Sequence, residues 1–140
     1  MTTAVPSIFH LALNISNLDQ ARQFYGGVLG CEEGRSTATW VDFSFFGHQL
    51  SLHLGAPLTT APTGQVDQHL VPMPHFGVVL TLDDWRVLAA RLTAAGIKFV
   101  IPPSIRFAGE PGEQHTMFFV DPFGNPLEIK GFRHWDAVYA

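Results

Sequence analysis

The sequence has little charge and almost no cysteine. Of its 140 residues only 14% are charged, and Cys31 is the one cysteine. A single thiol excludes a disulfide framework and a zinc site built from several thiolates of one chain. Apolar residues make up 46% of the chain, and this balance argues against intrinsic disorder. The composition therefore predicts a packed globular core.

Positive charge and long apolar runs are also scarce. Lys and Arg number 8 against 12 Asp and Glu, which leaves a formal net charge of −4, and the basic residues form no cluster. We therefore expect no nucleic-acid partner. The apolar runs are too short to predict a membrane span. Met1–Ser7 contains no cationic region followed by an apolar stretch, so we expect no secretory signal, no membrane partner and a cytoplasmic location.

The first half of the chain combines strand and helix patterns. Period-two alternation predicts a strand over Ile8–Ile15, and apolar residues at helical spacing predict a helix over Leu18–Leu29 behind a polar cap at Ser16–Asp19. Three short strands are predicted after it, over Cys31–Thr37, Trp40–Phe46 and Gln49–Leu54.

The second half repeats this order. A strand is predicted over His75–Leu80 and a helix over Trp85–Ala95, behind a cap at Thr81–Asp84. The segment Asp121–Asn125 is dense in turn-forming residues. Further strands are predicted over Phe99–Ile101, Thr116–Val120 and Pro126–Gly131.

Residues 55–74 separate the two halves. Pro57, Pro62, Pro72 and Pro74 argue against regular structure through most of this stretch, which is then either a lid or a plain connector. The halves begin 65 residues apart and neither is large enough to close its own core. We therefore expect one domain over residues 1–140, with pseudo-repeat modules at about 6–56 and 73–132 joined by the loop 55–74.

Three residues of metal-ligand type lie on strand faces opposite apolar ones. His10 shares a face with Ala12 and Asn14, His75 begins the matching strand of the second half, and Glu128 lies in the last predicted strand. Taken singly, such residues are more often packed histidines or solvated glutamates. Two histidines at equivalent points of a repeat, together with a carboxylate, suit a divalent metal. Iron(II) is favoured, and manganese, nickel or zinc fits the same donors.

At this point the chain resembles the vicinal oxygen chelate superfamily, which includes glyoxalase I, bleomycin and fosfomycin resistance proteins and extradiol dioxygenases. The motifs extend from His10 to Phe132, nearly the whole chain, and the Asp-Pro-x-Gly-Asn-x-x-Glu pattern is the most specific of them. The segments that carry the resemblance are FHLAL at Phe9–Leu13, NLDQARQFY at Asn17–Tyr25, HFGVV at His75–Val79 and FVDPFGNPLEI at Phe119–Ile129.

The resemblance implies an α+β fold in which two βαβββ modules form an open, curved mixed β-barrel around a metal ion. By motif position its usual ligands correspond to His10, His75 and Glu128. Glyoxalase I takes a fourth, acidic ligand from the last strand of the first module, and the matching position here is Ser51. Serine is a poor metal ligand, so the pattern is nearer to the three-ligand extradiol dioxygenases.

Two histidines are candidates for acid–base catalysis. His53 shares a strand face with Ser51 and is either an acid–base residue at the metal or a histidine at the core edge. The segment Arg106–His115 is typical of a loop near a pocket mouth, and the alternative is an ordinary solvated loop. In the first interpretation Arg106 holds a substrate carboxylate and His115 transfers a proton.

Aromatic residues complete the candidate site. Phe45 and Phe119 are predicted to line a substrate pocket, although packing explains most of the 12 phenylalanines. The resemblance also implies a homodimer.

We expect a metal-dependent enzyme that acts on a small oxygenated or aromatic substrate. A divalent ion that binds two vicinal oxygens stabilises the anionic form of the substrate. Open positions on iron(II) would admit dioxygen and favour a dioxygenase, whereas the other metals favour a glyoxalase-like isomerase or lyase. The alternatives are a non-catalytic, drug-binding resistance-type protein and an epoxide-opening enzyme of the fosfomycin resistance type, which needs a cationic pocket that Arg106 and Lys130 would supply.

Overall fold

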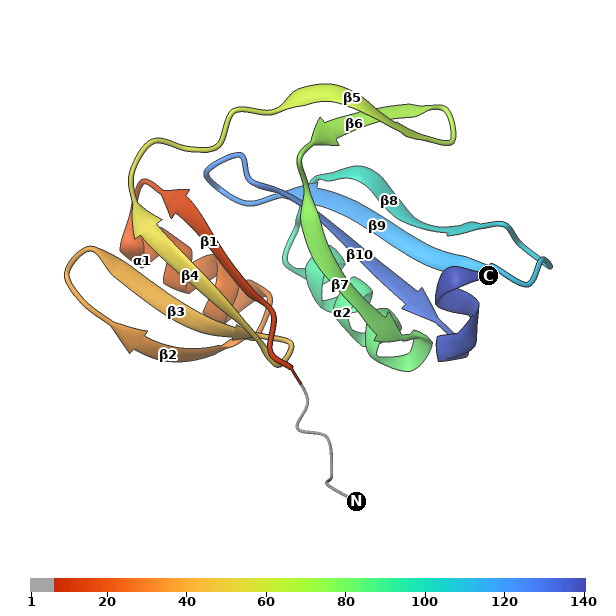
Figure 1. The fold of residues 1–140 in the computed structure, drawn as a ribbon, viewed down its shortest axis with the longest axis horizontal. Coiled ribbons are helices and arrows are strands. Elements are labelled where there is room, and N and C mark those ends of the chain that lie inside the picture. The colour runs from red at the N-terminus through yellow and green to blue at the C-terminus, as the bar shows by residue number, and fades with distance from the viewer. Residues whose placement is uncertain (1–6) are drawn as a thin grey trace, which may run out of the picture. The chain divides into compact units, whose positions relative to one another are not determined.

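The computed structural model describes residues 7–140, and the chain divides into two compact units, residues 1–57 and 58–140 (Figure 1). Each unit contains a four-stranded sheet. In the first the strand order is β1 (His10–Ile15), β4 (His48–Leu54), β3 (Trp40–Phe45) and β2 (Glu32–Ser36), and in the second it is β7 (Phe76–Thr81), β10 (Pro126–Phe132), β9 (Gln114–Val120) and β8 (Phe99–Arg106). In both, the chain runs strand, helix and then three strands, so the α+β class and the βαβββ repeat are confirmed. The expectation about Met1–Ser7 concerns a segment of which only Ser7 is described.

The first unit follows the predicted order of elements. Asn17 caps the helical segment, because its side chain accepts a 2.9 Å hydrogen bond from the backbone N–H of Gln20. The segment continues as a π-helix, however, and not as one α-helix over residues 18–29. The elements are β1 His10–Ile15, α1 Leu18–Ala21, the π-helix η1 Arg22–Val28, β2 Glu32–Ser36, β3 Trp40–Phe45 and β4 His48–Leu54.

The core of the first unit lies between its sheet and its helical segment. Tyr25 of η1 is fully buried, and its ring centroid lies 6.0 Å from that of Phe43 on β3. Strand β1 runs parallel to β4, and β3 is antiparallel to β4. Because successive strand residues point to opposite faces, His10 and Asn14 lie on the face away from the helical segment, where both are exposed.

The second unit repeats this topology with a longer helix. Thr81 caps that helix by accepting a 3.3 Å hydrogen bond from the backbone N–H of Asp84. Trp85 anchors the helix on the sheet, since its indole N–H donates to the carbonyl of Ile129 at 3.0 Å. The elements are β7 Phe76–Thr81, α2 Leu82–Ala94, β8 Phe99–Arg106, β9 Gln114–Val120, β10 Pro126–Phe132 and the short 3-10 helix η2 Trp135–Tyr139.

The expectation of an irregular segment over residues 55–74 is wrong for most of its length. The chain forms a β-hairpin there, with strands β5 Ala61–Val66 and β6 His69–Met73 (Figure 1). Val66 and Val71 form a buried cluster with Ile101 of β8 and Phe118 of β9. Prolines are tolerated because each strand of a two-stranded sheet has a free edge, where a missing N–H breaks no ladder hydrogen bond.

Two further loop predictions have different outcomes. The turn Asp121–Asn125 is confirmed, because a carboxylate oxygen of Asp121 accepts 2.8 Å hydrogen bonds from the backbone N–H groups of Phe123 and Asn125. The predicted loop Arg106–His115 is shorter than expected. Strand β8 extends to Arg106 and β9 begins at Gln114, so both ends of that segment are strand residues.

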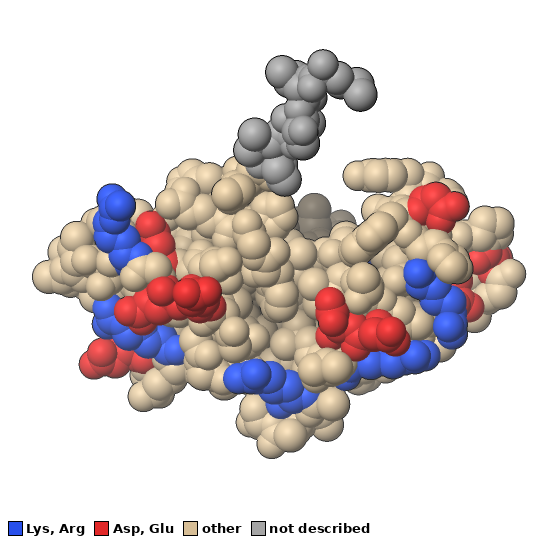
Figure 2. All heavy atoms as spheres, turned by 90° about the horizontal axis from the view of Figure 1, so that it is seen from below, with Lys and Arg blue, Asp and Glu red and all other residues tan. Residues whose placement is uncertain are grey.

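The surface agrees with the charge distribution of the sequence. On the face drawn in Figure 2, basic side chains lie beside acidic ones in small groups and form no continuous basic patch. Within residues 7–140, none of the helices combines the length and the apolar character that a membrane crossing requires.

Candidate metal centre

The second unit brings His75 and Glu128 together, as the sequence predicts. His75 immediately precedes β7, and β7 pairs in parallel with β10, which carries Glu128 opposite Gly77. The Nε2 atom of His75 lies 3.5 Å from Oε1 of Glu128. The two side chains are 20% and 8% exposed, so the pair is largely removed from water but still accessible.

Both members of this pair are held by a second hydrogen bond. The Nδ1 atom of His75 lies 2.9 Å from the carbonyl oxygen of Pro72, at the end of the hairpin. The hydroxyl of Thr116, which is almost fully buried on β9, donates to Oε2 of Glu128 at 2.7 Å. These contacts leave Nε2 of the imidazole and Oε1 of the carboxylate facing each other. Metal-ligating histidines and carboxylates commonly have such supporting bonds.

The geometry sets Nε2 of His75 opposite Oε1 of Glu128. A carbonyl oxygen can only accept, so the Nδ1 atom of His75 carries a proton, and Nε2 is the ring nitrogen that faces the carboxylate. Either a proton on Nε2 or a cation between the two atoms would join them favourably. Two donors 3.5 Å apart can both bind one divalent ion at about 2.0–2.2 Å. The donor set therefore fits part of a site for iron(II), manganese, nickel or zinc.

A pocket of about 250 Å³ opens onto the pair, and Lys130 lines it together with His75, Glu128 and the start of β7. Lys130 lies two residues beyond Glu128 and pairs in register with Thr116, so it projects from the same face of the sheet. Among residues 7–140, its ammonium group makes neither an ion pair nor a hydrogen bond. The pocket therefore contains one cation without a partner.

His10 belongs to the other unit. It lies on the exposed face of the first sheet, beside Gln49 in register. Within each unit, over residues 7–57 and 58–140, no group of three or more His, Cys, Asp or Glu side chains is close enough to hold a metal ion. The second unit by itself therefore supplies two of the three predicted ligands, and the contribution of His10 stays a prediction.

The first sheet also shows where His53 and Ser51 lie. His53 pairs with Asn14, which is four residues, or about 13 Å along the strand, from His10. Its ring centroid lies 6.1 Å from that of Trp40. Ser51 is buried, and its hydroxyl donates to Oδ1 of Asp42 at 2.6 Å. The carboxylate of Asp42 therefore lies beside Ser51, but it belongs to the neighbouring strand β3.

Arg106 lies on the same face of the second sheet as Glu128, as a candidate for substrate binding requires. Its Nε atom lies 3.2 Å from Oδ2 of Asp67 in the hairpin turn, and its side chain is 17% exposed. The guanidinium group is therefore already matched by a carboxylate. The ion pair also ties the turn of the hairpin to the end of β8.

Three of the predicted site residues lie on the helix-facing sides of their sheets. His115 is 7% exposed and stacks edge-on against Trp85 of α2, at a ring separation of 5.2 Å. Burial, followed by the repulsion from Arg86, lowers the pKa of His115. Phe119 is fully buried on that same face of β9, and Phe45 is 5% exposed on the core face of β3. These positions are those of core residues, and their predicted catalytic and binding roles stay predictions.

The sequence analysis did not single out Thr116 or Asp42, and it named Lys130 only for the epoxide-opening alternative; the structure places all three beside the predicted site residues. Strand alternation is the pattern that could have pointed to them. Thr116 is two residues from Phe118, the partner of Glu128, and Lys130 is two residues from Glu128 itself, so these side chains share one face of the sheet. Asp42 alternates with Val41, Phe43 and Phe45, so it lies on the opposite face of β3 from these apolar residues.

Comparison with known proteins settles the family. The sequence model of the Glyoxalase/Bleomycin resistance protein/Dioxygenase superfamily matches residues 7–129. The chain belongs to this superfamily. A glyoxalase/bleomycin resistance protein/dioxygenase from Alicyclobacillus acidocaldarius shares 31% sequence identity over 95% of this chain and 96% of its own, with a TM-score of 0.78. No curated protein sequence matches the chain.

Two solved structures of lower sequence identity share the fold. The fosfomycin resistance protein FosX from Listeria monocytogenes is 14% identical, with a TM-score of 0.69 over 96% of this chain and 98% of its own. TioX from Micromonospora sp. ML1 is 19% identical, with a TM-score of 0.65 over 90% of this chain and 98% of its own. At these identities the likeness concerns the fold alone.

Proposed function

We propose that this superfamily member is a metal-dependent enzyme whose ion is held by His75, Glu128 and His10. The observation that carries the proposal is the placement of Nε2 of His75 3.5 Å from Oε1 of Glu128, with each side chain fixed from behind by a hydrogen bond. Supporting hydrogen bonds of this kind are common behind metal-ligating histidines and carboxylates. Iron(II) is the metal that we favour.

The reaction that we favour is oxygenation of a small oxygenated or aromatic substrate. When bound, a divalent ion lowers the pKa of the substrate oxygens that it contacts. Ser51 leaves the first module without an acidic side chain at the position that resembles a fourth ligand, and this supports a three-ligand, dioxygenase-type centre. The residues of this chain hold the ion, and the pocket lined by His75, Glu128 and Lys130 receives the substrate.

One observation favours a second candidate, a glyoxalase-like isomerase or lyase. The carboxylate of Asp42 accepts hydrogen bonds from Ser51 at 2.6 Å and from Gln49 at 3.3 Å, so it is held in place on the exposed face of the first sheet. A positioned carboxylate can serve as a general base for proton transfer. The two candidates differ in one requirement, because only the first consumes dioxygen.

Metal analysis tests the proposed centre. We expect protein purified without oxygen to contain close to one divalent ion per chain, and we expect H75A and E128Q to lose it. H134A serves as the matched control, because His134 is exposed and lies outside the pocket. Oxygen uptake with a panel of catechols then separates oxygenation from isomerisation. Unchanged metal content in H75A would remove the proposal.

We also propose that the enzyme is a cytoplasmic homodimer. Light scattering during gel filtration should then give about twice the chain mass of 15.4 kDa. A monomeric mass at micromolar concentration would contradict this part of the proposal without affecting the metal centre.

A further inference from the structure

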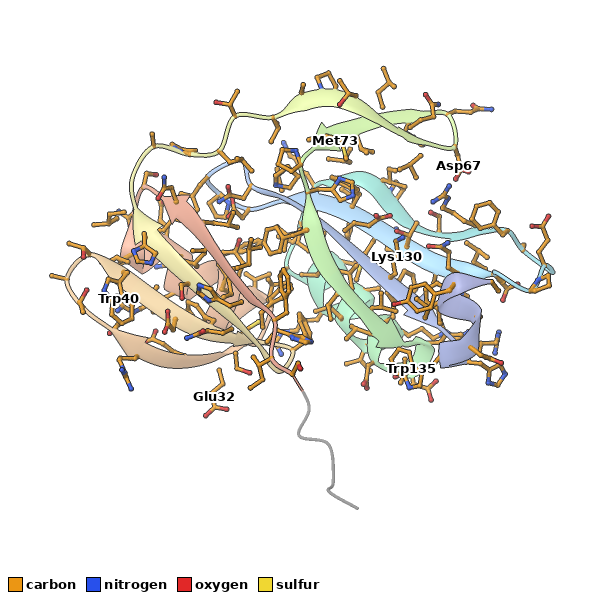
Figure 3. All side chains as sticks on the ribbon, in the orientation of Figure 1. Glu32, Trp40, Asp67, Met73, Lys130 and Trp135 are labelled. Atoms are coloured by element: carbon orange, nitrogen blue, oxygen red, sulfur yellow. The ribbon has the colours of Figure 1, made fainter. Side chains whose placement is uncertain are left out.

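Lys130 is the feature of the pocket that the proposed metal centre does not use. It is half-buried, it lines the pocket with His75 and Glu128, and its ammonium group has no partner among the described residues 7–140. A half-buried cation without a counter-ion lacks the compensation that most such groups have. The group is therefore available to a ligand. Figure 3 shows Lys130 on β10 between the neighbouring strands of the sheet.

The charges around Lys130 indicate what that ligand is. Glu128 is the acidic residue that lies with Lys130 on the pocket wall, and in the proposed centre its free oxygen binds the ion. Arg106, the other cation on this face, is already paired with Asp67. A divalent ion, one carboxylate and one ammonium group together carry a net charge of +2 in the pocket. An anionic ligand would balance this excess.

We propose that Lys130 selects substrates that carry a carboxylate next to the oxygens that bind the ion. This inference rests on the proposed function and adds the substrate class: a small carboxylic acid with a vicinal pair of oxygens. The oxygen pair would bind the ion held by His75 and Glu128, and the ammonium group of Lys130 would donate to the carboxylate. A charge-assisted bond in a half-buried pocket is stronger than one at an open surface. The residue is thus a determinant of specificity rather than a metal ligand.

The alternative role for Lys130 is structural, as a charge that offsets Glu128 without touching substrate. The two roles differ in what a neutral side chain at residue 130 would change. If the role is structural, the affinity for every ligand of the ion changes by the same factor. If Lys130 recognises a carboxylate, only the affinity for ligands that carry a carboxylate falls.

Calorimetric titration of zinc-loaded protein distinguishes these roles without relying on turnover. The probes are 2,3- and 3,4-dihydroxybenzoate, each compared with the methylcatechol that has a methyl group in place of the carboxylate. The variants are K130M, which removes the charge, and K130R, which keeps it. K98M is the matched control, because Lys98 is the only other lysine and is exposed. Circular dichroism and zinc content verify that each variant is folded and loaded.

We expect wild-type protein and K98M to prefer at least one dihydroxybenzoate over its methylcatechol. In K130M that preference should fall by about tenfold, while zinc content and affinity for the methylcatechols stay within about twofold. K130R should retain most of the preference. A preference that survives in K130M, or an equal loss for all four probes, would overturn the inference alone. Failure of the wild-type protein to bind zinc would overturn the proposed function as well.

Discussion

The contact between Gly77 and Glu128 gives the sharpest prediction, because it links the packing of the second sheet to the proposed metal centre. Gly77 of β7 lies opposite Glu128 of β10, and a Cβ atom added to Gly77 would overlap the backbone carbonyl of Glu128. Neither backbone can turn away as a flexible side chain can. The substitution G77A therefore requires the two strands to separate at the point that joins His75 to Glu128.

The size of the effect follows from this overlap. Overpacking in a well-packed interior costs about 1–3 kcal/mol, and each ladder hydrogen bond that is lost as the strands part adds about 1 kcal/mol. We expect G77A to lower the free energy of unfolding by about 3 kcal/mol or more. Because His75 and Glu128 move apart, we also expect metal affinity to fall more steeply than stability alone explains.

Two other glycines provide the comparison. A Cβ added to Gly131 would lie 2.6 Å from Trp85 on the helix side of the same sheet, so G131A should destabilise the unit while leaving the proposed ligands His75 and Glu128 in place. A Cβ added to Gly27 would meet nothing within 4 Å, and G27A should be neutral or slightly stabilising. Urea unfolding and metal titration of the three variants test the reasoning. Wild-type stability in G77A would refute it, and so would equal losses of metal affinity in G77A and G131A.

Three further predictions concern single contacts. T116V removes the 2.7 Å bond to Glu128 and should lower metal affinity about 10–100-fold in titration, whereas T93V, which removes a bond within α2, should leave the affinity unchanged. Burial lowers the pKa of His115, so the folded protein favours the neutral ring. The stability that the neutral ring contributes is therefore fully present above about pH 6.5, the ordinary pKa of histidine, and is lost as the pH falls through the lowered pKa. H115N should therefore flatten the fall in unfolding free energy between pH 7 and 5, and an unchanged slope would contradict this. Val71 of β6 is fully buried where the hairpin packs on Ile101 and Phe118, so V71A should lower the free energy of unfolding by about 2 kcal/mol and speed hydrogen exchange in β5 and β6. Unaltered exchange there would count against the packing described.

The elements of the two modules were predictable from local patterns. Alternation over Phe9–Leu13 and the Asn17 and Thr81 caps are signals that neighbouring residues produce among themselves. The hairpin over residues 61–73 was missed because its prolines are unfavourable in isolation. The hairpin depends instead on contacts between residues far apart in the chain. Its two strands pair with each other, and its residues Val66 and Val71 are buried against β8 and β9. No local pattern contains these contacts.

The residues of the candidate site were likewise predictable only in part from the sequence. Residue type and repeat position predicted His75 and Glu128 as metal ligands, and the structure brings their side chains within 3.5 Å of each other. For His115 and Phe119 the type of side chain suggested chemistry, but the direction in which each points depends on strand register. A shift of one residue moves a side chain from the pocket face to the helix face, and both point toward α2.

The sequence by itself determined the order of strands and helices within each of the two modules and the repeat of that order, because these depend on periodicity and capping over short distances. Only the tertiary structure decided which side chains share a face. It placed Thr116 behind Glu128, paired Arg106 with Asp67 and left Lys130 unpaired in the pocket. These outcomes depend on how β8, β9 and β10 pair in register and on where the hairpin packs, and both are set by contacts between residues far apart in the chain.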